Sequence, residues 1–259
     1  MECRPISSRS DAKPQADTSA KRIEIVRSFL KRFDHFRAQE EQSLPLIGRF
    51  LKRFTIRLGT LREEEESWRR ATAPDFNVFR MLRLERRETK LHSRFLAELL
   101  DPNGLHGQEN LFLSEFLELA QKSGLQCPPG LPADLIWKVT TEEAVNAHDR
   151  LDIVLRGSPR GYLGDRFVMV VENKVDAAEG SEQLSRYYKD WLQNQQANFR
   201  NLVFLTVDGR EPKTISKDKC LCLSYREHIT GWLRKVLDRI QAKRLQFAIE
   251  QYLEVLNSL

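Results

Sequence analysis

Three ionisable residues stand on apolar segments where a buried strand ordinarily carries no charge. Asp152 lies inside the apolar run 150–156, and Glu172 and Lys174 follow directly on the run Phe167–Val171. Charged groups are costly to bury unless they pair with one another or bind a cation. Because side chains alternate along a strand, Glu172 and Lys174 project to the same face. The pattern indicates carboxylates and an ammonium group gathered at one site.

The spacing of the two runs predicts that their carboxylates meet. In a hairpin whose loop is centred near Tyr162, Asp152 falls opposite Glu172, and directly opposed residues project to the same side of a sheet. Two close carboxylates suit a hard divalent cation such as Mg²⁺, which takes few protein ligands and keeps several waters. The alternative is a structural ion pair, although such a pair stabilises a fold little relative to apolar replacements.

A cation at this position gives each residue a chemical task. It would bind a phosphate oxygen, lower the pKa of a bound water and stabilise the leaving oxygen. Lys174 would orient that water and offset charge that builds up on the phosphate. Beside a cation and partly desolvated, the Lys174 ammonium is expected to lose its proton more easily than a free lysine.

The apolar periodicities around this hairpin predict an α/β fold. Strands are expected at residues 135–141, 150–156, 167–175, 201–207 and 221–223. Helices are expected at residues 76–85, 88–100, 109–121, 179–195 and in two stretches near the C-terminus. The resulting order of helix, three strands, helix and strand gives a mixed central sheet flanked by helices, within a core domain over residues 73–259.

The first 72 residues carry no recognisable chemistry. Residues 1–20 are polar and lack the apolar region of a secretory signal, so a disordered tail is expected. Residues 21–72 form an N-terminal helical extension, in which a break before Pro45 predicts two amphipathic helices in an antiparallel hairpin. A packing extension is favoured over a partner-docking or DNA-facing arm, since nothing chemical is placed there.

Composition limits the partners only weakly. The 259 residues include 42 Lys and Arg against 37 Asp and Glu, a net charge of +5 that permits an anionic partner without demanding one. The four cysteines lack the spacing of a zinc or redox motif. No run of about 18 apolar residues is present. We therefore expect a reduced, cytoplasmic protein with no membrane partner.

Three motifs carry a family resemblance. Asp152 followed by Glu172-Asn173-Lys174 resembles the catalytic motif of the PD-(D/E)XK nuclease superfamily, although Leu151 stands where a proline is usual. Gln183 and Tyr187 are similar to the Gln-x-x-x-Tyr motif of the superfamily's RecB-like branch. Upstream, residues 88–102 resemble the N-terminal motif of one bacterial family within it. The match runs in the expected order from about residue 77 to residue 232.

The resemblance implies a restriction-endonuclease-like core of order αβββαβ and a Mg²⁺-dependent nuclease, with Mn²⁺ as a substitute. DNA is the expected substrate, RNA is not excluded, and a homodimer would bring two sites to a duplex. The implied catalytic residues are Asp152, Glu172, Lys174, Gln183, Tyr187 and Glu88. The implied metal ligands are Asp152, Glu172 and the backbone carbonyl of Asn173.

Several of these residues also have ordinary structural interpretations. Gln183 and Tyr187 would contact phosphate or base by resemblance, or else form a plain helix flank. Glu88 is either an accessory carboxylate that reaches metal-bound water or a helix N-terminal acid favoured by the dipole. His92, a lone histidine beside an apolar stripe, is expected to be a hydrogen-bonded core residue rather than a ligand.

Basic residues near Glu88 suggest a nucleic-acid surface. Four of them recur at spacings of four, three and four along a helical region, and a fifth lies within the Gln-x-x-x-Tyr motif: Arg83, Arg87, Lys90, Arg94 and Arg186. Phosphate contacts of this kind supply affinity that falls with salt, but a solvated charged face explains the pattern equally well. A catalytically inactive nucleic-acid-binding or assembly module is the alternative function, and a helical interaction protein with an incidental ion pair is a third.

Overall fold

The computed structural model describes residues 16–128, 131, 133–146 and 148–259, with side chains of the first helix described over 23–39 and 45–72. The chain divides after Asp75 into two units. Most of the expected disordered tail, residues 1–15, lies outside the described residues. Residues 16–20 of that tail belong to the first helix.

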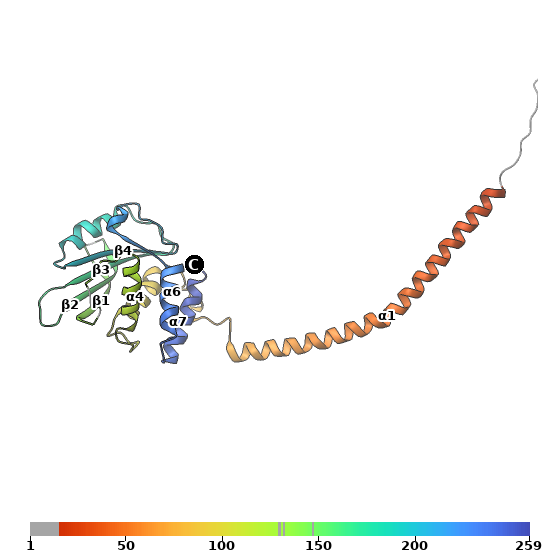
Figure 1. Cartoon of the computed structure of the whole chain (residues 1–259), viewed down its shortest axis with the longest axis horizontal. Coiled ribbons are helices and arrows are strands. Elements are labelled where there is room, and N and C mark those ends of the chain that lie inside the picture. Colours follow the sequence, from red (N-terminus) through yellow and green to blue (C-terminus); the bar gives the residue numbers. More distant parts are fainter. Residues whose placement is uncertain (1–15, 129–130, 132, 147) are drawn as a thin grey trace, which may run out of the picture. The chain divides into compact units, whose positions relative to one another are not determined.

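The first unit contains a single long helix. α1 (Ala16–Thr72) runs for 57 residues without interruption, with Pro45 inside it (Figure 1). The expected hairpin of two helices is therefore wrong. An interior proline removes one backbone hydrogen bond and kinks a helix, but good helix formers on both sides allow it to continue. The described side chains of α1 are exposed within this unit, and its role as a packing extension stays a prediction.

The second unit is built on a five-stranded sheet of order β1-β2-β3-β4-β5. The strands are β1 (Leu135–Ala144), β2 (Arg150–Pro159), β3 (Phe167–Lys174), β4 (Phe199–Thr206) and β5 (Leu221–Ser224). β1, β2 and β3 are antiparallel neighbours, while β3–β4 and β4–β5 are parallel. The predicted mixed sheet, with its strands in the expected order along the chain, is confirmed.

The hairpin of β2 and β3 has the register predicted from the sequence. Ile153 pairs with Val171 and Val154 with Val170. One further step along the same register places Asp152 opposite Glu172. β3 is buried from Phe167 through Asn173 because β2 and β4 lie on either side and helices cover both faces. The predicted site therefore lies at a buried strand end.

Helical elements cover both faces of the sheet (Figure 1). Before the sheet lie α2 (Val78–Met81), the π-helical turn η1 (Glu88–Ser93), α3 (Arg94–Leu100) and α4 (Leu111–Lys122). Between β3 and β4 lie α5 (Gln183–Arg186), η2 (Tyr187–Trp191) and η3 (Leu192–Asn194). The C-terminal part holds η4 (Lys217–Lys219), η5 (Tyr225–Ile229), α6 (Thr230–Leu237) and α7 (Lys243–Leu256).

Alternation along the central strands divides the core into two layers. Val154, Val168 and Val170 pack with Leu184 and Tyr187 of the α5–η2 segment. Residues of the opposite parity join a larger cluster with α3, α4, α6 and α7. Among the described helices, none combines the length and apolarity needed to span a bilayer.

Candidate active site

The predicted acidic and basic residues lie together on the sheet face that α5 and η2 cover. Asp152 has the parity of Val154, and Glu172 and Lys174 that of Val170, the two valines that pack against this segment. The Nζ of Lys174 lies 2.8 Å from Oε1 of Glu172. The backbone N–H of Asn173 donates to Oδ2 of Asp152 at 2.8 Å. The hairpin thus brings Asp152 to the end of β3.

Glu172 is the most enclosed carboxylate of this group, with 1% of its surface exposed. Its Oε1 accepts from Lys174 and from Nε2 of Gln183, each at 2.8 Å. Its Oε2 is buried and has no hydrogen-bond partner among the residues that the structure describes. A buried oxygen without a donor is unfavourable in a folded protein. A cation beside Asp152 would satisfy it, so the residues present fit a divalent metal.

The electrostatics reflect this crowding of acids. Burial raises the pKa of Glu172 to about 8, and the Asp152 charge adds to the shift. Burial also raises the pKa of Asp152 to about 6, although the Asn173 N–H works against it. For Lys174 burial alone would lower the pKa, but the Glu172 and Asp152 carboxylates outweigh it and raise the pKa. This direction follows from the protein groups alone; the expected lowering of the Lys174 pKa beside a cation stays a prediction.

The set of side chains that could ligate a metal ion is small. Among the described residues, no three or more His, Cys, Asp or Glu side chains are arranged to hold a metal ion. Asp152 and Glu172 instead offer two carboxylates, which matches the few protein ligands and several waters that Mg²⁺ prefers. Ligation by the backbone carbonyl of Asn173 stays a prediction.

Gln183 and Tyr187 act on Glu172 and on the backbone of β2. Nε2 of Gln183 donates both to Oε1 of Glu172 and to the Tyr187 hydroxyl, each at 2.8 Å. The Tyr187 hydroxyl donates in turn to the backbone carbonyl of Arg150 at 2.8 Å. Tyr187 is only 1% exposed, so it makes no outward contact in this arrangement. The two side chains tie the end of β3 to the start of β2.

Glu88, at the start of η1, holds the turn that follows Lys174. Its Oε1 accepts the backbone N–H groups of Val175 at 2.7 Å and of Asp176 and Ala177 at 3.0 Å each. Sequence reasoning missed this contact because it joins segments almost 90 residues apart. The expected role on metal-bound water stays a prediction, and the observed one is positional.

The opposite face of β3 is tied into the core by Asn173. Its Nδ2 donates to Oγ of Ser93 at 3.1 Å, and its Oδ1 accepts from the Tyr225 hydroxyl at 2.8 Å. Nearby, the ring nitrogens of His92 contact the Tyr252 hydroxyl at 2.8 Å and the Glu85 carbonyl at 3.0 Å. Burial lowers the pKa of His92. His92 is the hydrogen-bonded core histidine that the sequence predicts.

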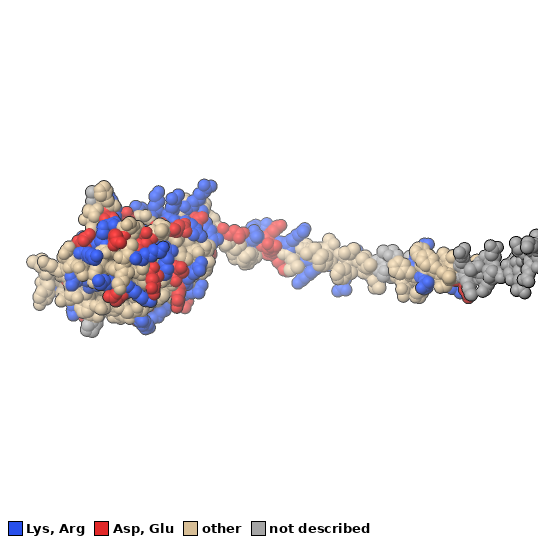
Figure 2. Space-filling model, turned by 90° about the horizontal axis from the view of Figure 1, so that it is seen from above, with Lys and Arg blue, Asp and Glu red and all other residues tan. Residues whose placement is uncertain are grey.

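The basic residues do not form the single helical stripe expected. Arg83, Arg87, Lys90 and Arg94 are exposed, but only Lys90 and Arg94 lie on η1 and α3. Arg83 adopts a positive φ of 54° in the preceding turn, which breaks the helical spacing. Arg186 is engaged by Asp149 through contacts of 2.8 and 3.0 Å. Figure 2 shows basic and acidic side chains mixed over the visible face of this unit.

Taken together, the mixed sheet and the Asp152, Glu172 and Lys174 set at its central hairpin define a restriction-endonuclease-like protein. A sequence model of the PD-(D/E)XK nuclease superfamily matches residues 76–254, and the chain belongs to that superfamily. The match begins where the second unit begins, at Phe76. No curated protein and no solved structure matches the chain.

Proposed function

We propose that this chain is a Mg²⁺-dependent nuclease that hydrolyses phosphodiester bonds of DNA in the cytoplasm, with Mn²⁺ able to replace Mg²⁺. Membership in the nuclease superfamily points to this reaction class. The observation that carries the metal dependence is Oε2 of Glu172, a buried carboxylate oxygen without a donor beside Asp152. A hard cation is the partner that such an oxygen lacks.

Asp152 and Glu172 would hold the cation, which supplies charge neutralisation on the phosphate and a bound water of lowered pKa. Lys174 keeps its ammonium directed at Glu172, 2.8 Å away. From there it orients the attacking water and offsets charge on the phosphate. Gln183 fixes the Glu172 carboxylate, and Tyr187 fixes Gln183. Glu88 fixes the turn after Lys174.

The nucleic acid would approach beside that turn. An open hollow of about 330 Å³ is lined by Arg86, Arg87, Glu88, Thr89, Lys90, Asp176 and Ala177. Arg86 is paired with Asp176 at 2.5 Å, whereas Arg87 and Lys90 are exposed. Arg87 and Lys90 are therefore the proposed phosphate contacts, with Arg83 and Arg94 further along. Arg186 takes part only if it leaves Asp149.

The test is cleavage of linear duplex, circular duplex and single-stranded DNA, and of RNA, with Mg²⁺ or Mn²⁺. Asp152→Ala and Lys174→Ala should each lose about 100- to 1,000-fold in rate. Lys122→Ala is the control, because it removes an exposed lysine paired with Glu118 at 2.7 Å. Unchanged cleavage in the two site variants would refute the assignment.

Salt-sensitive DNA binding without cleavage under either metal would favour the inactive binding module instead. The complete set of Asp152, Glu172 and Lys174 argues against that alternative, since a module that only binds has no catalytic need for all three.

A further inference from the structure

α1 carries an apolar seam at heptad spacing, which charged residues interrupt. Its described members follow one another by three and four residues from Ile23 to Phe33 and from Ile47 to Leu61, and Phe33 and Ile47 lie two heptads apart in the same register. The seam consists of Ile23, Val26, Leu30, Phe33, Ile47, Leu51, Phe54, Leu58, Leu61 and Trp68. In heptad terms these are a and d positions. Pro45 falls at b, away from the seam, so its missing hydrogen bond does not break the repeat.

The period of the seam distinguishes between kinds of partner. A straight helix turns 3.6 residues per turn, so a seam of period 3.5 drifts by about 20° per heptad. From Ile23 to Trp68 the drift reaches about 130°, which would carry the seam off any flat surface. A membrane surface or a sheet face therefore cannot take its whole length. A second helix that supercoils around α1 keeps contact throughout.

The seam is exposed enough to need a partner. Its ten side chains are each between 37% and 55% exposed. Half of a large side chain's 150–250 Å² is roughly 80 Å², so the seam presents about 800 Å² on one helix. That area is the share that one partner contributes to a stable protein interface. Long helices in water are stabilised mainly by packing of such a face.

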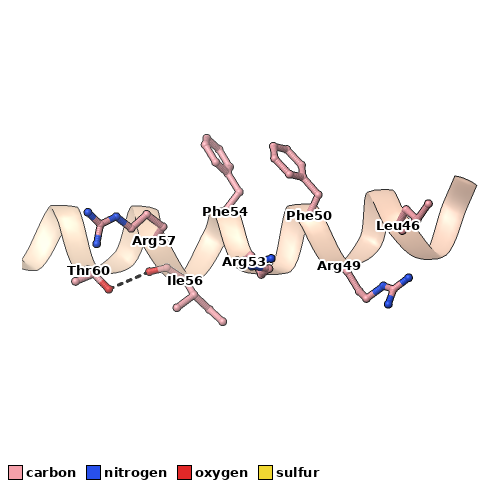
Figure 3. Close-up of a pocket in the computed structure, with 8 residues that line it drawn as sticks. All are labelled: Leu46, Arg49, Phe50, Arg53, Phe54, Ile56, Arg57 and Thr60. Carbon is pink, nitrogen blue, oxygen red and sulfur yellow. Dashed lines mark hydrogen bonds between the residues drawn. The ribbon is translucent and has the colours of Figure 1, made fainter.

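Aromatic residues widen the seam on one side. Phe29, Phe36 and Phe50 occupy g positions, and Phe29 and Phe50 stack on the seam residues Phe33 and Phe54 with centroids 6.3 and 6.0 Å apart. Figure 3 shows Phe50 and Phe54 projecting from the same side of α1 and Ile56 from the other.

We propose that α1 is a coiled-coil segment that pairs with α1 of a second copy of this chain. A second copy offers a seam of the same length, period and chemistry, which is the self-complementarity that a two-fold interface requires. Two described a positions, Arg37 and Glu65, are polar. Polar a residues cost stability but fix the register of a coiled coil. This inference does not rest on the proposed nuclease activity.

Sedimentation equilibrium on the full chain from about 0.1 to 50 µM tests the proposal. Wild type should be dimeric, and Leu51→Glu should raise the dissociation constant about 100-fold or more, because it buries a carboxylate in the seam. Ile56→Glu is the matched control: Ile56 is 62% exposed against 53% for Leu51, receives the same charge, and lies at f. It should leave the dissociation constant unchanged within about threefold.

Circular dichroism and urea unfolding of both variants show whether the second unit stays folded. A monomeric wild type at every concentration would overturn the proposal, as would equal weakening by Ile56→Glu and Leu51→Glu. Binding of a monomeric chain to anionic phospholipid vesicles would assign the seam to a membrane surface and would also overturn it. Loss of cleavage in Asp152→Ala leaves the dimer unaffected, so this proposal and the nuclease assignment fail separately.

Discussion

Glu172→Gln should stabilise the protein in the absence of divalent metal and abolish its response to Mg²⁺. Glu172 is 1% exposed, and its Oε2 has no hydrogen-bond partner. Glutamine keeps the size and the acceptor for Lys174 and Gln183 but never ionises. The substitution therefore removes the electrostatic cost of the buried charge and keeps most of the packing.

The magnitude follows from the pKa of Glu172, which burial raises from 4.5 to about 8. For an acid whose folded pKa is raised, the stabilising contribution is fully present below the unfolded pKa, here 4.5, and is lost as pH rises through about 8. The shift is about 3.5 pKa units, or at most about 5 kcal/mol. As pH rises from 4.5 to 8, the free energy of unfolding of wild type should thus become progressively lower than that of Glu172→Gln.

Urea unfolding from pH 5 to pH 9, with EDTA or with Mg²⁺ in excess, measures this difference. Mg²⁺ should restore wild type at high pH by binding the folded state and should not affect Glu172→Gln. The control is Glu143→Gln. Burial alone would raise the pKa of Glu143, but Arg156, 2.7 Å away, outweighs it and lowers the pKa. The stabilisation from the ionised Glu143 is present above pH 4.5 and is lost as pH falls. Glu143→Gln should therefore be less stable than wild type at pH 7.

A difference between wild type and Glu172→Gln that does not vary with pH would refute the reasoning, because the buried charge would then cost nothing. Equal stabilisation of both proteins by Mg²⁺ would place the cation elsewhere.

Three further predictions concern the same site. Binding of Mg²⁺ at pH 7 should release about one proton, mainly from Glu172 with its pKa of about 8; calorimetry in buffers of different ionisation enthalpy measures it, and Glu172→Gln should release none. Tyr187→Phe leaves the Arg150 carbonyl without the Tyr187 donor and should lower the free energy of unfolding, measured in urea, by about 1–3 kcal/mol. A urea transition at the same midpoint as wild type would contradict this. Glu88→Gln should speed hydrogen exchange at the amides of residues 175–177, which a charged acceptor now protects; unchanged protection would show that the carboxylate charge is not needed there.

The hairpin register was predictable because a strand has a strict period of two. Once β2 and β3 are identified and their loop is centred at Tyr162, the pairing of Ile153 with Val171 is fixed, and with it the approach of Asp152 to Glu172. The contacts of Glu88 and Tyr187 were not predictable in this way. Each joins a side chain to a backbone group 37 or more residues away, and backbone groups leave no pattern in a sequence.

The predicted hairpin of two helices within residues 21–72 is wrong for a different reason. The polar stretch before Pro45 predicts a break between two helices. An interior proline costs about 3 kcal/mol, however, which is small beside the free energy of burying the roughly ten apolar residues that a supercoiled partner would cover. The heptad register across Pro45 carries the better information, because two separate helices have no reason to share it: Phe33 and Ile47 stand two full repeats apart. The retained heptad register, rather than the presence of a proline, therefore indicates that the helix continues across Pro45.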